Sequence, residues 1–179
     1  FCVFGLFSII SIFPLSFKIS SLQICVALKG CVNDCKSCIA KMSGDSDLYS
    51  DHSKLENFND LYIDKLKQVK DQGCKSIVIT SDKGEPMQNK IFMEKIGVFN
   101  KQLDNWFNLE IQTTGVFLDD NNLTFLKDKV GVNIISVSVF DIFDDDNNLD
   151  IIGVKKKMRF NLKEVCQNIK KHGFILRLS

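Results

Sequence analysis

The chain of 179 residues is 45% hydrophobic and 25% charged, which excludes a disordered protein and allows one domain with a hydrophobic core. Its formal net charge of +1 provides no overall field that would attract nucleic acid or an anionic membrane. The seven cysteines are odd in number and unevenly spaced, which is untypical of a secreted disulfide scaffold and indicates a reducing compartment and a metal site.

Residues 1–17 carry no charged side chain. This segment is short for a membrane span of roughly 20 residues, and Pro14 interrupts it. It also has neither the basic leading region nor the small-residue cleavage site of a signal peptide. We therefore expect a hydrophobic leader over residues 1–17 and one domain over residues 18–179. Because the first residue is Phe1 and a strand-like run stops at Ser179, we also expect a fragment whose carboxyl-terminal part is missing.

Short apolar runs alternate with helix-like segments through the rest of the chain. The strands are predicted over residues 22–28, 75–80, 108–114, 132–139 and 174–178. The helices are predicted over residues 54–71, 88–103, 119–129 and 161–172. Gly73 and Gly173 follow the first and last of these helices, where glycine commonly ends a helix. This alternation predicts an α/β fold with a parallel sheet and right-handed crossovers.

The two faces of each predicted strand differ in polarity. In the second strand, Ile77 and Ile79 share one face, whereas Ser76, Val78 and Thr80 share the other. A doubly wound sheet, covered by helices on both sides, would show near-continuous apolar runs instead. We therefore favour a partial TIM-like (βα) barrel of parallel strands, with helices outside and polar side chains inside. Ligands of such folds bind at the carboxyl ends of the strands.

Three cysteines follow the carboxyl end of the first predicted strand at C-x3-C-x2-C spacing: Cys31, Cys35 and Cys38. Structural zinc takes four protein ligands, and a fourth from Cys25 would have to come from the middle of that strand. Cys74 lies at the base of the second strand, which is the wrong end. Iron–sulfur clusters are also usually held by four cysteines. Three cysteines therefore suggest a cluster with one iron open to a non-protein ligand.

The run CVNDCKSC, which begins at Cys31, resembles the signature of the radical S-adenosylmethionine (radical SAM) superfamily, and the resemblance covers about residues 22–179. It implies that Cys31, Cys35 and Cys38 hold a 4Fe–4S cluster whose fourth iron binds the amino and carboxylate groups of S-adenosylmethionine. It further implies an enzyme that reductively cleaves S-adenosylmethionine to a 5′-deoxyadenosyl radical for hydrogen abstraction from a substrate. The subclass would be activase-like, or biosynthetic or modifying. A radical reaction also requires an enclosed cavity.

The stretch Gly84, Glu85 and Pro86, after the second predicted strand, is similar to the Gly-Gly-Glu-Pro motif of that family. The motif binds the amino group of the methionine moiety, and a carboxylate is a natural acceptor for an ammonium. Two positions depart from the family pattern. Lys83 replaces the first glycine, and Ser37 stands where the family often has an aromatic ring.

Three later positions give further, less specific support for an S-adenosylmethionine site. The resemblance implies cofactor contacts from Thr114, Ser138 and Arg177, which lie on or just after the last three predicted strands. The alternative for Arg177 is an ion pair with Glu110 in the core. Threonine and serine are common in strands, so these two positions are also compatible with a purely structural role.

Two other functions stay open on the residues alone. One is a structural zinc-binding or interaction module that uses Cys25, Cys31, Cys35 and Cys38. The other is an electron-transfer iron–sulfur protein, which would need a fourth cysteine near the loop. The resemblance also implies a cytoplasmic enzyme with an external electron donor such as flavodoxin or ferredoxin, and a small-molecule, peptide or protein substrate. We expect neither a nucleic-acid nor a membrane partner.

Overall fold

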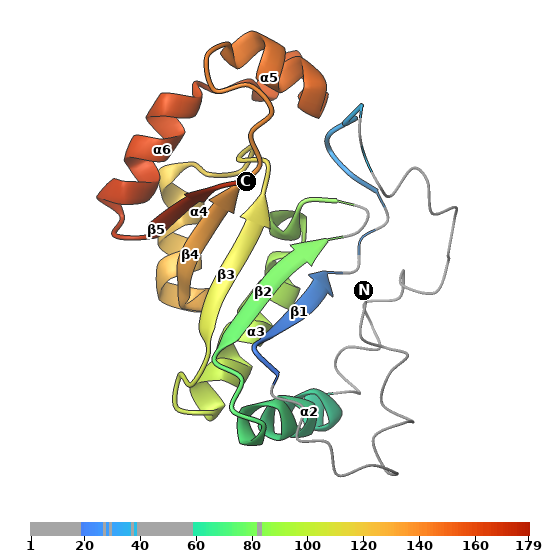
Figure 1. Cartoon of the computed structure of the whole chain (residues 1–179), viewed down its shortest axis with the longest axis vertical. Helices are drawn as coiled ribbons and strands as arrows, with labels where there is room; N and C mark the ends of the chain where they lie inside the picture. Colours follow the sequence, from blue (N-terminus) through green and yellow to red (C-terminus); the bar gives the residue numbers. More distant parts are fainter. Residues whose placement is uncertain (1–18, 27, 29, 37, 39–58, 82–83) are drawn as a thin grey trace.

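The computed structural model describes residues 19–26, 28, 30–36, 38, 59–81 and 84–179 (Figure 1). The strands are β1 (Ser21–Val26), β2 (Ser76–Ser81), β3 (Asn108–Thr113), β4 (Val132–Val137) and β5 (Ile175–Leu178). The helices are α2 (Asn59–Asp71), α3 (Lys90–Gln102), α4 (Asp120–Phe125), α5 (Asp145–Ile152) and α6 (Leu162–Lys171). Short helical turns are η3 (Pro86–Gln88), η4 (Leu126–Val130) and η5 (Lys156–Met158). Among these described residues, no helix has the length and apolar character that a membrane span requires.

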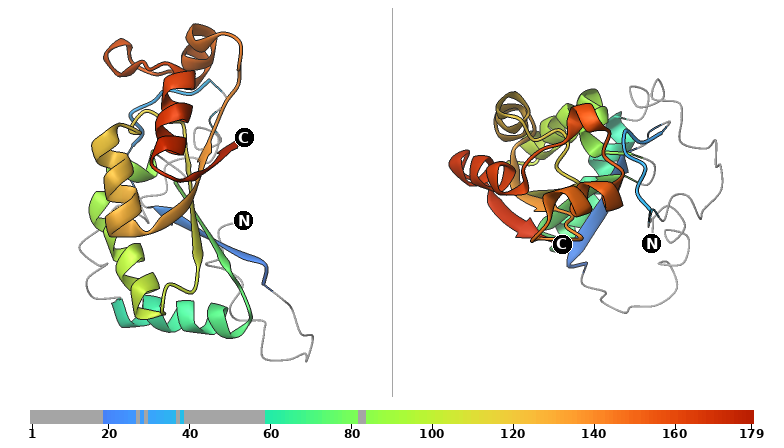
Figure 2. Two further views of the ribbon diagram at one scale, coloured as in Figure 1. Left: turned by 90° about the vertical axis from the view of Figure 1, so that its left-hand side faces the viewer. Right: turned by 90° about the horizontal axis from the view of Figure 1, so that it is seen from above.

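The five strands form one sheet in the order β1-β2-β3-β4-β5, and every neighbouring pair is parallel. Figure 2 shows α3 and α4 on the same side of this sheet, while its other face carries none of these helices. A sheet with helices on one side matches the predicted partial (βα) barrel and not the doubly wound alternative, so the predicted fold class is confirmed. The predicted leader, residues 1–17, lies outside the described residues.

The helix side of the sheet carries the hydrophobic core. Seven strand residues on this face are each at most 1% exposed: Val26, Ile77, Ile79, Leu109, Ile111, Ile135 and Val137. Side chains from the helices pack against them, among them Met93 of α3 and Ile169 of α6. Full burial of such a side chain is worth roughly 1.5–3 kcal/mol, so this layer supplies much of the driving force for folding.

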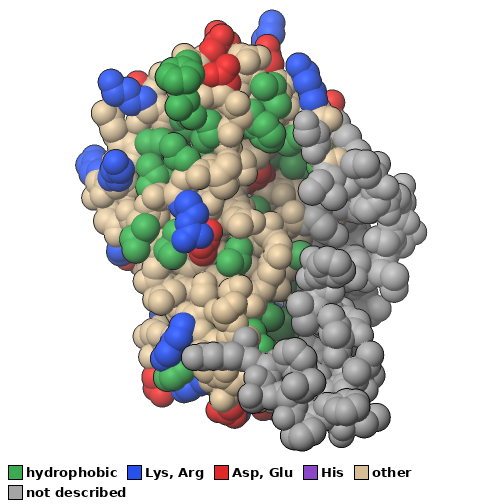
Figure 3. Space-filling view, in the orientation of Figure 1, with side chains coloured by type: hydrophobic (Ala, Val, Ile, Leu, Met, Phe, Trp, Pro, Cys, Tyr) green, Lys and Arg blue, Asp and Glu red, His purple; other side chains and the backbone are tan. Residues whose placement is uncertain are grey.

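The opposite face of the sheet is the predicted polar one. Gln112, Ser136 and Arg177 stand in one row across β3, β4 and β5. Figure 3 faces this side, and its surface shows mainly polar side chains and backbone, with hydrophobic side chains in separate spots. The polar face expected from the alternation of residues in the strands is thus present across β3, β4 and β5.

The sequence did not predict α5. Its first turn reads Asp-Asp-Asn-Asn, which is typical of a loop. The structure shows that Asp144 caps the helix, because its Oδ1 accepts a hydrogen bond of 3.0 Å from the backbone N–H of Asn147. The acidic Asp145 and Asp146 suit the positive end of the helix dipole, and Leu149 is buried. Capping and dipole effects therefore stabilise a helix that apolar periodicity alone does not reveal.

Candidate functional site

The three predicted cysteines lie at the carboxyl rim of the sheet, after β1. Cys31 is exposed, whereas Cys35 and Cys38 are half-buried, and none is in a disulfide. Burial, together with the neighbouring Cys31, Cys38 and Glu85, raises the pKa of the Cys35 thiol to about 11. Partial desolvation of its thiol likewise raises the pKa of Cys31, although the residue as a whole is exposed, and the N–H of Asn33 partly opposes this shift. The structure therefore brings the three thiols and Glu85 within electrostatic reach of one another.

The three thiols lie near one another but are not arranged as the ligands of a metal ion. Within the described ranges, no group of three or more His, Cys, Asp or Glu side chains is arranged to hold a metal ion. This holds equally for the zinc set that would add Cys25, which lies on β1 opposite Thr80. Either ligand set, for a cluster or for zinc, would therefore require the thiols to move closer together.

Glu85 is a buried carboxylate at the same rim, with only 4% of its surface exposed. Its Oε2 accepts a hydrogen bond of 2.5 Å from the hydroxyl of Thr113, and the N–H of Thr114 donates to Oε1 at 3.1 Å. Burial raises the pKa of Glu85, although these hydrogen bonds act to lower it. In the part of the chain that the structure describes, Glu85 forms no ion pair with a lysine, arginine or histidine. A buried carboxylate without a cation is costly, so this position suits a cationic ligand.

Asn33, inside the cysteine loop, was not singled out by the sequence. Its side chain is 8% exposed, and its Nδ2 donates a hydrogen bond of 2.9 Å to the hydroxyl of Thr114. Its Oδ1 is buried and has no hydrogen-bond partner among the residues that the structure describes. Thr114 therefore joins Glu85 to Asn33, since it donates to the former through its N–H and accepts from the latter. An unsatisfied buried acceptor costs about 1–3 kcal/mol, which indicates that a hydrogen-bond donor completes the site.

Gln88, the last residue of η3, ties the cysteine loop to Glu85. Its Nε2 donates to the carbonyl of Gly30 at 2.9 Å, and its Oε1 accepts from the N–H of Val32 at 3.3 Å. The same Oε1 accepts from the N–H of Glu85 at 2.8 Å. One side chain thus holds two segments that are far apart in the sequence, and the sequence offered no signal for this.

Replacement of Gln88 with methionine is expected to loosen the amino-terminal half of the loop. The variant keeps the length of the side chain but loses its hydrogen bonds, so amide hydrogen exchange at Val32 should become about tenfold faster. The exposed Gln102 at the end of α3 offers a control, since Gln102→Met should leave the Val32 amide unchanged. Unchanged protection at Val32 in Gln88→Met would show that another contact holds the loop.

The structure also places the predicted residues Gly84, Pro86 and Ser138. Gly84 and Pro86 flank Glu85, and a Cβ on Gly84 would lie 2.4 Å from Cδ1 of Leu28, so a side chain at this turn would require the Leu28 side chain to shift. Ser138 follows β4 and is half-exposed, with its N–H bonded to the carbonyl of Thr113 at 2.9 Å. Lys83 and Ser37, the two departures from the family pattern, lie outside the described residues.

Arg177 pairs with Glu110, which is the structural alternative stated for it. Its Nη1 lies 2.8 Å from Oε2 and 3.1 Å from Oε1 of Glu110. The Glu110 side chain is 3% exposed and that of Arg177 is 57% exposed. Arg177 therefore compensates a buried charge while the rest of its guanidinium faces the polar side of the sheet.

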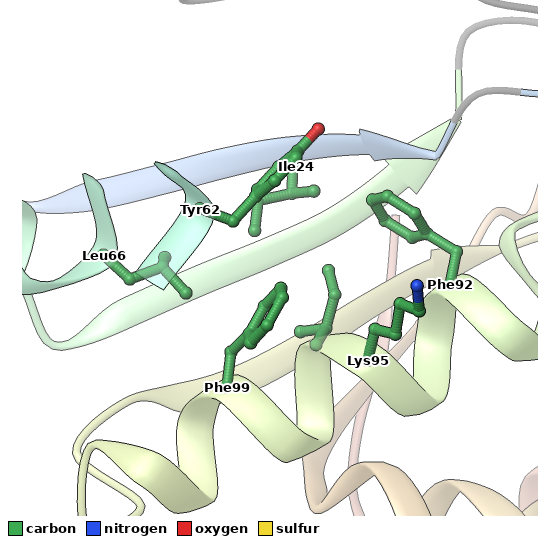
Figure 4. A pocket seen from close by; sticks show the side chains of 7 residues that line it. Ile24, Tyr62, Leu66, Phe92, Lys95 and Phe99 are labelled. Carbon is green, nitrogen blue, oxygen red and sulfur yellow. The ribbon is translucent and has the colours of Figure 1, made fainter. Parts of the chain in front are cut away.

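An apolar hollow on the helix side lies between β1, α2 and α3 and is not part of this rim (Figure 4). Tyr62 and Phe99 line it with stacked rings whose centroids are 6.2 Å apart. Its volume of about 10 Å³ holds one water molecule at most. Burial there raises the pKa of Tyr62. We regard this hollow as a packing gap in the core.

Comparison with solved structures finds similar folds. The chain superposes on native anSMEcpe with bound AdoMet with a TM-score of 0.60 and 19% identity, over 89% of this chain and 43% of that one. A polyhistidine-tagged form of anSMEcpe with bound AdoMet gives 0.61 and 19%, over 89% and 42%. Native anSMEcpe with bound AdoMet and Cp18Cys peptide gives 0.60 and 19%, over 88% and 42%. anSMEcpe is an anaerobic sulfatase-maturating enzyme of the radical SAM type.

The likeness at this identity concerns the fold alone, a partial (βα) barrel of parallel strands. The chain spans less than half of the length of these neighbours. No model of a known protein family matches the chain, and no curated protein matches it.

Proposed function

We propose that this chain is the core of a radical SAM enzyme. It would hold a 4Fe–4S cluster on Cys31, Cys35 and Cys38 and cleave S-adenosylmethionine reductively to a 5′-deoxyadenosyl radical that abstracts hydrogen from a substrate. The observation that carries the proposal is the buried Glu85, which has no cationic partner among the described residues and lies beside the three thiols at the rim. The shared fold with AdoMet-bound neighbours supports it.

The residues present fit both groups. Three thiolates satisfy three irons of a 4Fe–4S cluster and leave the fourth iron open, which is the arrangement that a ligand-binding cluster needs. Binding would release the thiol protons that burial now favours on Cys31 and Cys35. An ammonium group has three donors, and the rim offers the Glu85 carboxylate and the Oδ1 of Asn33 as buried acceptors. The amino group of S-adenosylmethionine has this chemistry.

The bound cluster supplies the electron for cleavage, and the protein contributes position and enclosure. Glu85 would receive the ammonium of the cofactor, and Thr113 and Thr114 keep its carboxylate in place through their hydrogen bonds. The Gly84–Pro86 turn lets the backbone approach the ligand closely. We assign Ser138 and Arg177 to further cofactor or substrate contacts, because both lie on the polar side or at the rim of the sheet.

The proposed enzyme also needs a substrate and an electron donor as partners. We propose an external donor of the flavodoxin or ferredoxin kind and a cytoplasmic setting, in which thiols stay reduced. The substrate is a small molecule, a peptide or a protein.

Anaerobic reconstitution with iron and sulfide tests the proposal. The chain should turn brown and retain about four iron and four sulfide ions. Reduction in the presence of S-adenosylmethionine should then release 5′-deoxyadenosine. A colourless chain that retains one zinc ion would instead support the zinc-binding module.

A further inference from the structure

We propose that Gly153, directly after α5, is a positioning residue that seats the cysteine loop and thereby fixes where Cys35 meets the cluster. The cluster part of this inference rests on the proposed function, whereas the seat itself is a property of the chain. The loop follows β1 and α5 follows β4, so the contact joins the first and fourth βα units of the sheet.

Two backbone hydrogen bonds attach the loop to the end of α5. The N–H of Asp34 donates to the carbonyl of Gly153 at 3.2 Å, and the N–H of Lys36 donates to the carbonyl of Ile151 at 2.9 Å. These donors flank Cys35 on both sides. The carbonyls at a helix C-terminus have no partner within the helix, so the loop satisfies groups that would otherwise need water. Cys35 is therefore held through its own neighbours.

The approach at Gly153 is too close for a side chain. Its φ of 70° lies in the left-handed region, and a Cβ built there would be 2.3 Å from the carbonyl oxygen of Asp34. Gly131, after η4, has a similar φ of 78° but no heavy atom within 4 Å of such a Cβ. Both glycines allow the turn, but only Gly153 also provides the space in which the loop sits.

Side-chain packing fixes Cys35 in the same place. Cys35 packs against a small cluster of buried side chains, Leu149, Ile152 and Val154, that is separate from the main core. This cluster belongs to α5 and the residue after Gly153. A displacement of α5 would therefore displace the thiol of Cys35 as well as its backbone.

α5 is itself held firmly, so it can act as a seat. The Oδ1 of Asn148, a residue that is 1% exposed, accepts hydrogen bonds from the N–H groups of Phe140 at 2.8 Å and Asp141 at 3.2 Å. Arg159 forms ion pairs with both Asp146 and Asp150 on the outer side of the helix. Contacts that do not involve the cysteine loop therefore hold α5 in place.

Amide hydrogen exchange in the cluster-free chain tests the seat directly. In the wild type, the amides of Asp34 and Lys36 should be protected. In Gly153→Ala their exchange should become about tenfold faster, whereas Gly131→Ala carries a comparable backbone strain and should leave both amides unchanged. The pair Gly153→Asn and Gly131→Asn repeats the comparison with a residue that tolerates positive φ, in case alanine prevents folding.

Reconstitution of the same variants tests the positioning role. Gly153→Ala should bind the cluster about tenfold more weakly or worse, and the EPR spectrum of its reduced cluster should differ from the wild type, while Gly131→Ala keeps the wild-type spectrum. Unprotected Asp34 and Lys36 amides in the wild type, or equal behaviour of the two glycine variants, would overturn the inference. If the wild type takes up no cluster but its Asp34 and Lys36 amides are protected, the proposed function is wrong, whereas the positioning of the loop by Gly153 is supported.

Discussion

Replacement of Cys35 with alanine is expected to abolish cluster binding, with iron content after reconstitution falling to background. The physical reason is that three thiolates are the minimum for a site-differentiated cluster, and Cys35 is the central one, flanked by Cys31 and Cys38. Cleavage of S-adenosylmethionine to 5′-deoxyadenosine should disappear with the iron. Iron analysis, the visible spectrum and product chromatography on the reconstituted variant measure these losses.

The matched control is Cys166→Ala. Cys166 is a half-buried thiol on α6, away from the cysteine loop, and it packs against the core. This variant should keep the iron content and the spectrum of the wild type. Full iron content in Cys35→Ala would contradict the assigned ligand set, and retention of one zinc ion by the wild type with loss in Cys25→Ala would favour the zinc module.

Replacement of Glu85 with glutamine is expected to weaken ligand binding without lowering the stability of the ligand-free chain at neutral pH. S-adenosylmethionine should bind about ten- to a hundredfold more weakly, because a hydrogen bond to a charged group is worth about 1.5–3 kcal/mol. The ligand-free chain should become no less stable at neutral pH. Since the folded-state pKa of Glu85 is raised, the fold favours its protonated form, so the wild type loses stability as the pH rises from the unfolded-state pKa through the folded one. Glutamine is neutral and removes that loss.

Glu110→Gln is the control for this experiment. Glu110 is equally buried but is already paired with Arg177, so its removal should lower stability by about 1–2 kcal/mol, a value reduced by the exposure of the arginine. It should not weaken an ammonium ligand at the rim. Equilibrium dialysis with S-adenosylmethionine and thermal melts across pH 5–8 separate the two variants. A Glu85→Gln chain that binds the ligand like the wild type would show that Glu85 has only a structural role.

The strands of the sheet and the cysteine motif could be recognised in the sequence because both are local patterns. The alternation of Ile77 and Ile79 with Ser76 and Thr80 reveals the two faces of a strand directly, and the cysteine spacing is a feature of the sequence itself. The predicted strands match the observed ones to within a few residues at each end. Local patterns were therefore sufficient for the architecture.

The supports of the loop could not be predicted because they are long-range hydrogen bonds. Gln88 and Val32 are 56 positions apart, and Asn33 and Thr114 are 81 apart. Nothing in the neighbourhood of these polar residues distinguishes them from ordinary turn and surface residues. Arg177 illustrates the opposite case, since parity placed it correctly on the polar face but could not decide between a ligand contact and the observed pair with Glu110.

The seat on α5 has a consequence for the order in which the protein is made. The cysteines leave the ribosome with the first βα unit, but the carbonyls that hold their loop belong to a helix that follows β4. Local contacts form early in folding, and contacts between distant segments have to wait for the chain between them. The loop of a nascent chain that ends before α5 has no seat. The proposed cluster should therefore be inserted only after α5 has been made, when most of this domain is already folded.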